Sequence, residues 1–139
     1  MNAIERLIDQ HRACDAHLVD CESAVRAGQW QPALSHWQAF ETAMLAHFTL
    51  EETQLFPAFE DATGMRMGPT VVMRSEHEEM RALLTDVQAA LSQQDAAAFL
   101  GHGETLLILM QQHNMKEENV LYPMCGQHVA GLESMVAEP

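Results

Sequence analysis

The string HFTLEETQLFP occupies residues 47–57, and HNMKEENVLYP occupies residues 113–123. Both read H-x-x-x-E-E-x-x-L-aromatic-P, and the second follows the first by 66 residues. The same offset relates three residue pairs upstream, which are His11 and His77, Asp20 and Asp86, and His36 and His102. Core packing explains leucines that recur, but it does not explain histidines and glutamates that recur in register. The chain is therefore predicted to contain an internal repeat, whose halves span about residues 1–66 and 67–132.

Within each string, a histidine and a glutamate lie four residues apart. Residues at this spacing share one face of a helix, so each string presents an imidazole beside a carboxylate. The first paired histidine of each half adds a further imidazole. The predicted metal ligands are His11, His47, Glu51, His77, His113 and Glu117. Nitrogen and oxygen donors suit iron, manganese or zinc better than Cu(I) or an iron–sulfur cluster, which prefer thiolates.

Apolar residues recur at intervals of three and four through most of the chain, which predicts amphipathic helices. Four helices are expected, over about residues 2–27, 32–57, 70–91 and 95–123. Asn2 and Asp95 suit the N-cap positions of the first and last helices. Pro57 is expected to kink or end the second helix, and Pro123 with Gly126 to end the fourth.

Long amphipathic helices with short links favour an all-α fold, an antiparallel up-down-up-down four-helix bundle with an internal two-fold repeat. Segment 61–69 contains two glycines and a proline and is expected to be the central loop between the halves. The first and third helices carry their predicted ligand histidine early, whereas the second and fourth carry theirs late. Antiparallel pairing would therefore bring all four histidines to the same end of the bundle.

The composition limits the class of protein. At 139 residues, 47% of them hydrophobic, the chain is long enough for one domain with a real core, expected over residues 1–139. The net charge of −13 argues against nucleic acid or an anionic membrane as partner. No apolar run approaches the roughly 18 residues of a membrane span. Three cysteines without a C-x-x-C motif, and no N-terminal signal pattern, lead us to expect reduced thiols and a cytoplasmic location.

These residues and spacings resemble the hemerythrin-like, or HHE cation-binding, family. The resemblance is carried by the six predicted ligands and by the L-F/Y-P ending of each string, and it covers nearly the whole chain. It implies two non-haem iron ions, bridged by Glu51 and Glu117 and by an oxo or hydroxo group, with manganese or zinc as alternatives. One ion would be held by the ligand histidines of the first half and the other by those of the second.

The oxygen carriers of this family have a fifth ligand histidine, four residues after the histidine of the third helix. Arg81 stands at that position here, and a guanidinium has no lone pair to offer a metal. The chain more closely resembles the four-histidine, two-glutamate centres of the repair-of-iron-centres branch.

Three residues near the predicted site are open to two interpretations. The carriers place their last carboxylate five residues after the final histidine, so Glu118 competes with Glu117. Asp15 is either an additional ligand or the partner of Arg81 in an inward ion pair. Tyr122 is either a donor of a hydrogen bond or an electron near the metal, or an aromatic packing residue.

The resemblance implies a soluble di-iron protein that reacts with or senses O2, NO or peroxide, or that handles iron. The alternatives are reversible O2 binding or storage, and a structural or regulatory module that metal stabilises. The absence of an E-x-x-H motif argues against a ferritin-like di-iron bundle. Small molecules are the expected partners. The ligands decide neither whether the protein is an enzyme, nor its catalytic residues, nor its oligomeric state.

Overall fold

The computed structural model describes residues 1–136, and over them the chain is all-helical, without a strand. The helices are α1 (Ala3–Arg26), α2 (Trp30–Leu50), α3 (Phe56–Thr63), α4 (Pro69–Ser92), α5 (Ala96–Lys116), α6 (Tyr122–His128) and α7 (Leu132–Met135). Two π-helical turns, η1 (Glu51–Leu55) and η2 (Glu117–Leu121), join α2 to α3 and α5 to α6 without a break. The all-α class expected from the sequence is confirmed.

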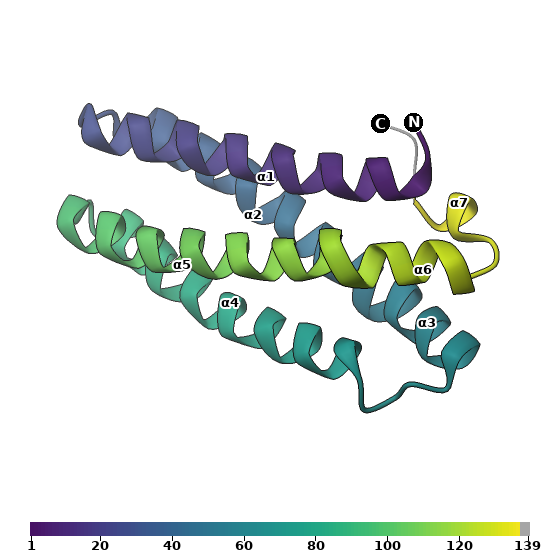
Figure 1. Ribbon diagram of the computed structural model, residues 1–139. Helices are drawn as coiled ribbons and strands as arrows, with labels where there is room; N and C mark the ends of the chain where they lie inside the picture. Colours follow the sequence, from purple (N-terminus) through teal and green to yellow (C-terminus); the bar gives the residue numbers. More distant parts are fainter. Residues whose placement is uncertain (137–139) are drawn as a thin grey trace.

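Each half of the chain forms one long helical hairpin. Figure 1 shows α1 beside α2 in the first half and α4 beside α5 in the second. The first hairpin turns through Gly28, whose φ of 71° lies in the left-handed region that glycine adopts without a steric cost. The second turns through Gln94, the repeat partner of Gly28, at a φ of 52°. The two hairpins therefore turn at equivalent positions of the repeat.

Side-chain caps fix the starts of two long helices, as the sequence predicts. Asn2 accepts a hydrogen bond from the Glu5 backbone N–H at 2.8 Å, and Glu5 in turn accepts from the Asn2 backbone N–H. Asp95 accepts from the Ala98 backbone N–H at 3.0 Å. Each cap satisfies a backbone donor that has no partner inside its helix.

Of the two outcomes expected at Pro57, a kink or an end, the end is wrong, as is the expected end of the fourth helix at Pro123, because helical residues continue past both prolines. Pro57 and Pro123 instead lie in the first turns of α3 and α6, directly after the π-helical turns. An N–H in the first turn needs no intrahelical acceptor, so proline is tolerated there. Gly126 lies inside α6, where an added Cβ atom would come within 2.8 Å of Ile4 Cδ1. That atom is the end of a flexible side chain, and α6 continues past Gly126 to His128.

Two separate apolar clusters fill the interior. The hairpin cluster lies toward the two hairpin turns and includes Trp37, Phe40 and Leu106, none of which is exposed. The terminal cluster lies toward the chain ends, α3 and α6, and includes Leu7 and Phe59. Burying each such side chain stabilises the fold by roughly 1.5–3 kcal/mol.

The predicted ligands lie between these clusters. In α1, His11 is flanked by Leu7 of the terminal cluster and Cys14 of the hairpin cluster. In α4, His77 lies in the same way between Met73 and Met80. The apolar stripes of the helices are thus interrupted at one level by a buried polar layer.

The sequence pattern is uninformative from Gln127 onward, yet part of this segment contributes to the core. Leu132 of α7 and Val136 are buried in the terminal cluster. Arg6 of α1 is itself buried and donates to the backbone carbonyls of Val136 at 3.1 Å and Glu133 at 3.0 Å. These contacts hold the segment against the start of α1. Among the described helices, none is both long and apolar enough to cross a membrane.

Candidate metal centre

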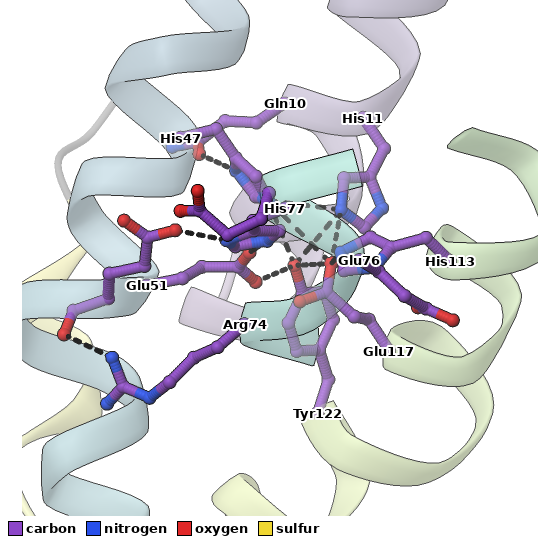
Figure 2. Close-up of polar contacts among 12 residues, drawn as sticks. Gln10, His11, His47, Glu51, Arg74, Glu76, His77, His113, Glu117 and Tyr122 are labelled. Carbon is purple, nitrogen blue, oxygen red and sulfur yellow. Dashed lines mark hydrogen bonds and ion pairs between the residues drawn. The ribbon is translucent and has the colours of Figure 1, made fainter. Parts of the chain in front are cut away.

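Six buried side chains converge in the polar layer between the two clusters. Figure 2 shows imidazoles and carboxylates turned toward a common centre. They are His11 of α1, His47 of α2, Glu51 of η1, His77 of α4, His113 of α5 and Glu117 of η2. Their exposed fractions are 5% or less. The structure therefore brings together every residue that the sequence predicts as a ligand.

The six residues form two overlapping groups of potential ligand atoms. Glu51, His77, His113 and Glu117 offer atoms that all lie within 4.8 Å of one another, as do His11, His47 and Glu117. We call the positions beside His11 and His47, and beside His77 and His113, the first and second half-sites. Glu117 belongs to both groups, and Glu51 Oε1 also approaches His47 Nε2 at 3.4 Å. Both carboxylates are thus placed between the half-sites.

Each of the four imidazoles is held on its outer side by a side-chain oxygen. The Nδ1 contacts are His11 to Glu118 at 2.7 Å, His47 to Gln10 at 2.7 Å, His77 to Glu52 at 2.6 Å and His113 to Glu76 at 2.9 Å. An ionised carboxylate or an amide oxygen only accepts, so Nδ1 carries a proton in each ring. In the neutral imidazole, Nε2 then presents a lone pair to the centre, which is the orientation that metal-binding histidines have.

Four of the inward atoms are buried without any hydrogen bond. They are His77 Nε2, His113 Nε2, Glu51 Oε1 and Glu117 Oε2. His77 Nε2 lies 3.1 Å from Glu51 Oε1, and His11 Nε2 lies 3.1 Å from His47 Nε2. A buried polar atom without a partner costs roughly 1–3 kcal/mol. Bound cations would satisfy these lone pairs, so the residues fit a metal centre.

The electrostatics of the layer also favour positive charge. Burial acts to lower the pKa of His47, but Glu51 and Glu117 outweigh burial and raise it to about 10. Contacts with Glu117 outweigh burial and raise the pKa of His113 as well. Burial acts to raise the pKa of Glu117, yet hydrogen bonds with Glu51 and three histidines lower it well below its usual value. Protons occupy this layer in the metal-free protein, and metal binding would displace them.

The two π-helical turns present the glutamates. The Phe56 N–H bonds to the Glu51 carbonyl, and the Tyr122 N–H bonds to the Glu117 carbonyl, each five residues back. A turn of this kind inserts one residue into the helix and is frequent at functional sites. Both copies occur at the same position of the repeat, so the local geometry is duplicated along with the ligands.

The second glutamate of each E-E pair lies outside the centre. Glu118 contacts the outer nitrogen of His11, and Glu52 contacts the outer nitrogen of His77. Each therefore supports a histidine of the opposite half of the chain. Of the two carboxylates that competed for the ligand role, Glu117 is placed among the inward atoms and Glu118 is not.

The structure does not form the ion pair between Asp15 and Arg81. Arg81 instead binds Glu52 through two contacts, at 2.7 and 2.9 Å, and also binds Glu78. Asp15 Oδ1 is buried without a hydrogen bond. Burial is the largest cause that raises the pKa of Asp15, with a further contribution from Glu118. The guanidinium thus neutralises a carboxylate that supports a histidine, which the sequence did not predict.

Sequence reasoning missed the outer acceptors as a set. Gln10 and Glu76 directly precede the first paired histidine of each half and are themselves 66 residues apart. This spacing equals the 66-residue offset between the two H-x-x-x-E-E strings, so it could have identified both acceptors. Glu52 carried a similar signal, because it recurs as Glu118.

Tyr122 is placed in the layer rather than beside it. Its hydroxyl donates to Glu51 Oε2 at 2.8 Å and lies 3.1 Å from Glu117 Oε1. Burial and the charges of these two carboxylates raise the pKa of Tyr122 well above its usual value. The hydroxyl therefore keeps its proton in the metal-free protein.

A comparison with protein families supports this centre. The model of the Hemerythrin HHE cation binding domain matches residues 2–125, which include all six inward residues. Searches of curated proteins and of solved structures gave no significant match. The matched region covers most of the chain and ends just after η2 and the start of α6. The chain belongs to the hemerythrin HHE cation binding domain family.

Proposed function

We propose that this chain, as one domain and an antiparallel up-down-up-down four-helix bundle, binds two iron ions through His11, His47, Glu51, His77, His113 and Glu117. The ions would supply reactivity toward a small molecule such as O2, NO or peroxide. In this proposal each half-site holds one ion, and Glu51 and Glu117 bridge them. Manganese or zinc could occupy the same donors.

One observation carries the proposal. All four imidazoles present Nε2 to a common centre, because each Nδ1 is engaged by an outer oxygen. Four imidazole nitrogens and two carboxylates around one centre need positive charge between them. Protons supply it in the metal-free protein, and bound cations would supply it in their place.

The surrounding residues fix and isolate this centre. The outer oxygens hold the ring orientations, which raises the basicity of the inward nitrogens. Phe48 stacks on His77 with ring centroids 3.9 Å apart, so one face of that imidazole is shielded from water. The apolar clusters on both sides keep the layer dry, which strengthens the electrostatic interactions within it.

Reversible oxygen storage is the second candidate function. The fifth histidine of the oxygen carriers is replaced by Arg81, whose guanidinium is engaged with Glu52. This contact directs the Arg81 charge to an outer carboxylate and leaves the inward donor set at four histidines. A centre of the repair-of-iron-centres type therefore agrees better with the chain. The cytoplasmic location of the protein stays a prediction.

A metal-stabilised structural or regulatory module is the third candidate. The inward residues join both hairpins through one layer, so any bound cation would hold the hairpins together. Zinc would serve this purpose as well as iron, because the role needs no redox chemistry.

Metal analysis of anaerobically purified protein, with its visible spectrum, tests the proposal. We expect close to two iron ions per chain and rapid oxidation in air without a stable oxygenated form. A stable band that oxygen removal reverses would favour the carrier, and zinc alone would favour the structural module. Protein that binds no iron, manganese or zinc after anaerobic loading would overturn the metal centre itself.

A further inference from the structure

One hydroxyl makes the two half-sites chemically different. Tyr122 is fully buried, and its oxygen lies 3.1 Å from His11 Nε2 and 3.2 Å from His47 Nε2. Its single proton is donated to Glu51 Oε2 at 2.8 Å. The same oxygen therefore lies within 3.2 Å of both inward histidine nitrogens of the first half-site.

The spacing of these atoms is that of donors around one ion. His11 Nε2 lies 3.0 Å from Glu117 Oε1 and 3.1 Å from His47 Nε2, and His47 Nε2 lies 3.9 Å from Glu117 Oε1. The Tyr122 oxygen is 3.1 Å from Glu117 Oε1. Donors held about 2.0–2.2 Å from a metal are separated by about 2.8–3.6 Å when they are neighbours and by more when they are opposed. All six separations among these four atoms are compatible with a shared ion.

We propose that the Tyr122 hydroxyl oxygen is a further metal ligand, and that it serves the first half-site only. The proposal rests on the proposed function, because it requires that this half-site binds an ion. When the oxygen binds an ion, the proton that it donates to Glu51 would be released to solvent.

The repeat supplies the comparison that limits this ligand to one half-site. Phe56 is the repeat partner of Tyr122 and has no oxygen. The ring of Tyr122 stacks on His11 at 5.5 Å and 24°, and the ring of Phe56 stacks on His77 at 5.6 Å and 30°. The rings are placed alike, so the half-sites differ here by a single atom. The Tyr122 oxygen would therefore bring the first half-site to four donors, the number that the second half-site already has.

The chain makes this proposal easy to test, because Tyr122 is its single tyrosine. The experiment loads the full chain with iron, oxidises it to iron(III), and records its visible and resonance Raman spectra together with iron content. We expect a phenolate-to-iron charge-transfer band whose excitation enhances tyrosine ring vibrations. Iron-loaded protein without those vibrations would overturn the proposal, because Tyr122 would then be only a hydrogen-bond donor.

Two variants sharpen the assignment. Tyr122→Phe should bind iron but lose the charge-transfer band, and a band that survives would overturn the proposal. Adding Phe56→Tyr to this variant moves the hydroxyl to the second half-site, so the ring vibrations should return. If the double variant binds iron but shows no tyrosine ring vibrations, the difference between the half-sites is not due to this one oxygen.

Iron content distinguishes a failure of this proposal from a failure of the proposed function. If the wild-type chain binds no iron, both fail. If it binds iron without tyrosine vibrations, only the ligand role of Tyr122 fails. Circular dichroism of each metal-free variant checks that the helices are retained, and a loss of helix in Tyr122→Phe would overturn the view that the hydroxyl acts through the metal rather than through the fold.

Discussion

The two half-sites share two inward histidines each and the carboxylates between them, and they differ in what surrounds these residues. Behind the second half-site, Glu52 is paired with Arg81 and Glu76 with Lys116, so both outer carboxylates are backed by cations. Behind the first half-site, the residue equivalent to Glu76 in the repeat is Gln10, whose side-chain oxygen is a neutral acceptor. The repeat has therefore kept the inward histidines and glutamates, while the residues that support them have diverged. This difference predicts two metal positions of unequal affinity and reactivity.

Removing the shared carboxylate should release metal from both half-sites and so abolish the difference between them. Glu117→Ala deletes an oxygen that belongs to both groups, so we expect most metal to be lost from both half-sites. Glu118→Ala is the matched control, because it removes the adjacent carboxylate, which touches only the outer side of His11. Metal content after anaerobic loading and dialysis measures both. Equal metal content in the two variants would contradict the assignment of Glu117 as the bridging residue.

Removing one histidine should separate the half-sites. His47→Ala is expected to release the metal of the first half-site, and His113→Ala that of the second, so each variant keeps about half of the wild-type metal. His17→Ala serves as control, since His17 is outside the layer, and should keep all of it. Elemental analysis of the three proteins checks this. The ligand assignment fails if His47→Ala retains as much metal as His17→Ala.

Exchanging the diverged acceptors should make the half-sites alike. Glu76→Gln weakens the support of His113, and loss of such an outer partner typically lowers metal affinity 10- to 100-fold. Gln10→Glu makes the reverse change beside His47 and should raise affinity at the first half-site. Competition with a metal chelator measures each constant. An unchanged affinity in Glu76→Gln would show that the outer acceptors do not set the difference between the half-sites.

The smallest effect is expected from the cation behind Glu52. Arg81→Gln removes two contacts to that carboxylate without touching an inward residue. The guanidinium is partly exposed, so its charge is screened, and we expect affinity at the second half-site to fall less than tenfold. The same chelator competition applies. A loss as large as that of Glu76→Gln would mean that Arg81 acts on the metal more directly than its contacts indicate.

The position of the polar layer could be read from the sequence because it depends on register alone. His47 and Glu51 recur as His113 and Glu117, and helical spacing then fixes which face each occupies. The N-caps Asn2 and Asp95 were equally accessible, since capping is a local preference. Such features need no knowledge of the contacts between hairpins.

Other features depended on information that a linear pattern does not contain. A π-helical turn changes the backbone hydrogen bonds by one residue and has no compositional signature, so Pro57 suggested a break instead of a continuous helix. The pairing of Arg81 with Glu52 depends on how α4 lies against η1. The burial of Leu132 and Val136 follows from docking against α1, and this short segment has no helical periodicity that could reveal it.

The polar layer that divides the core has a consequence for cooperativity. Each apolar cluster is continuous within itself, and the layer between them contains buried polar atoms that lack partners unless cations occupy it. Stripping the metal should therefore weaken the linkage between the two ends of the molecule more than either end itself. Amide hydrogen exchange would then resolve two cooperative units in the apoprotein, with α3 and α6 opening before the hairpin turns, and a single unit once metal is restored.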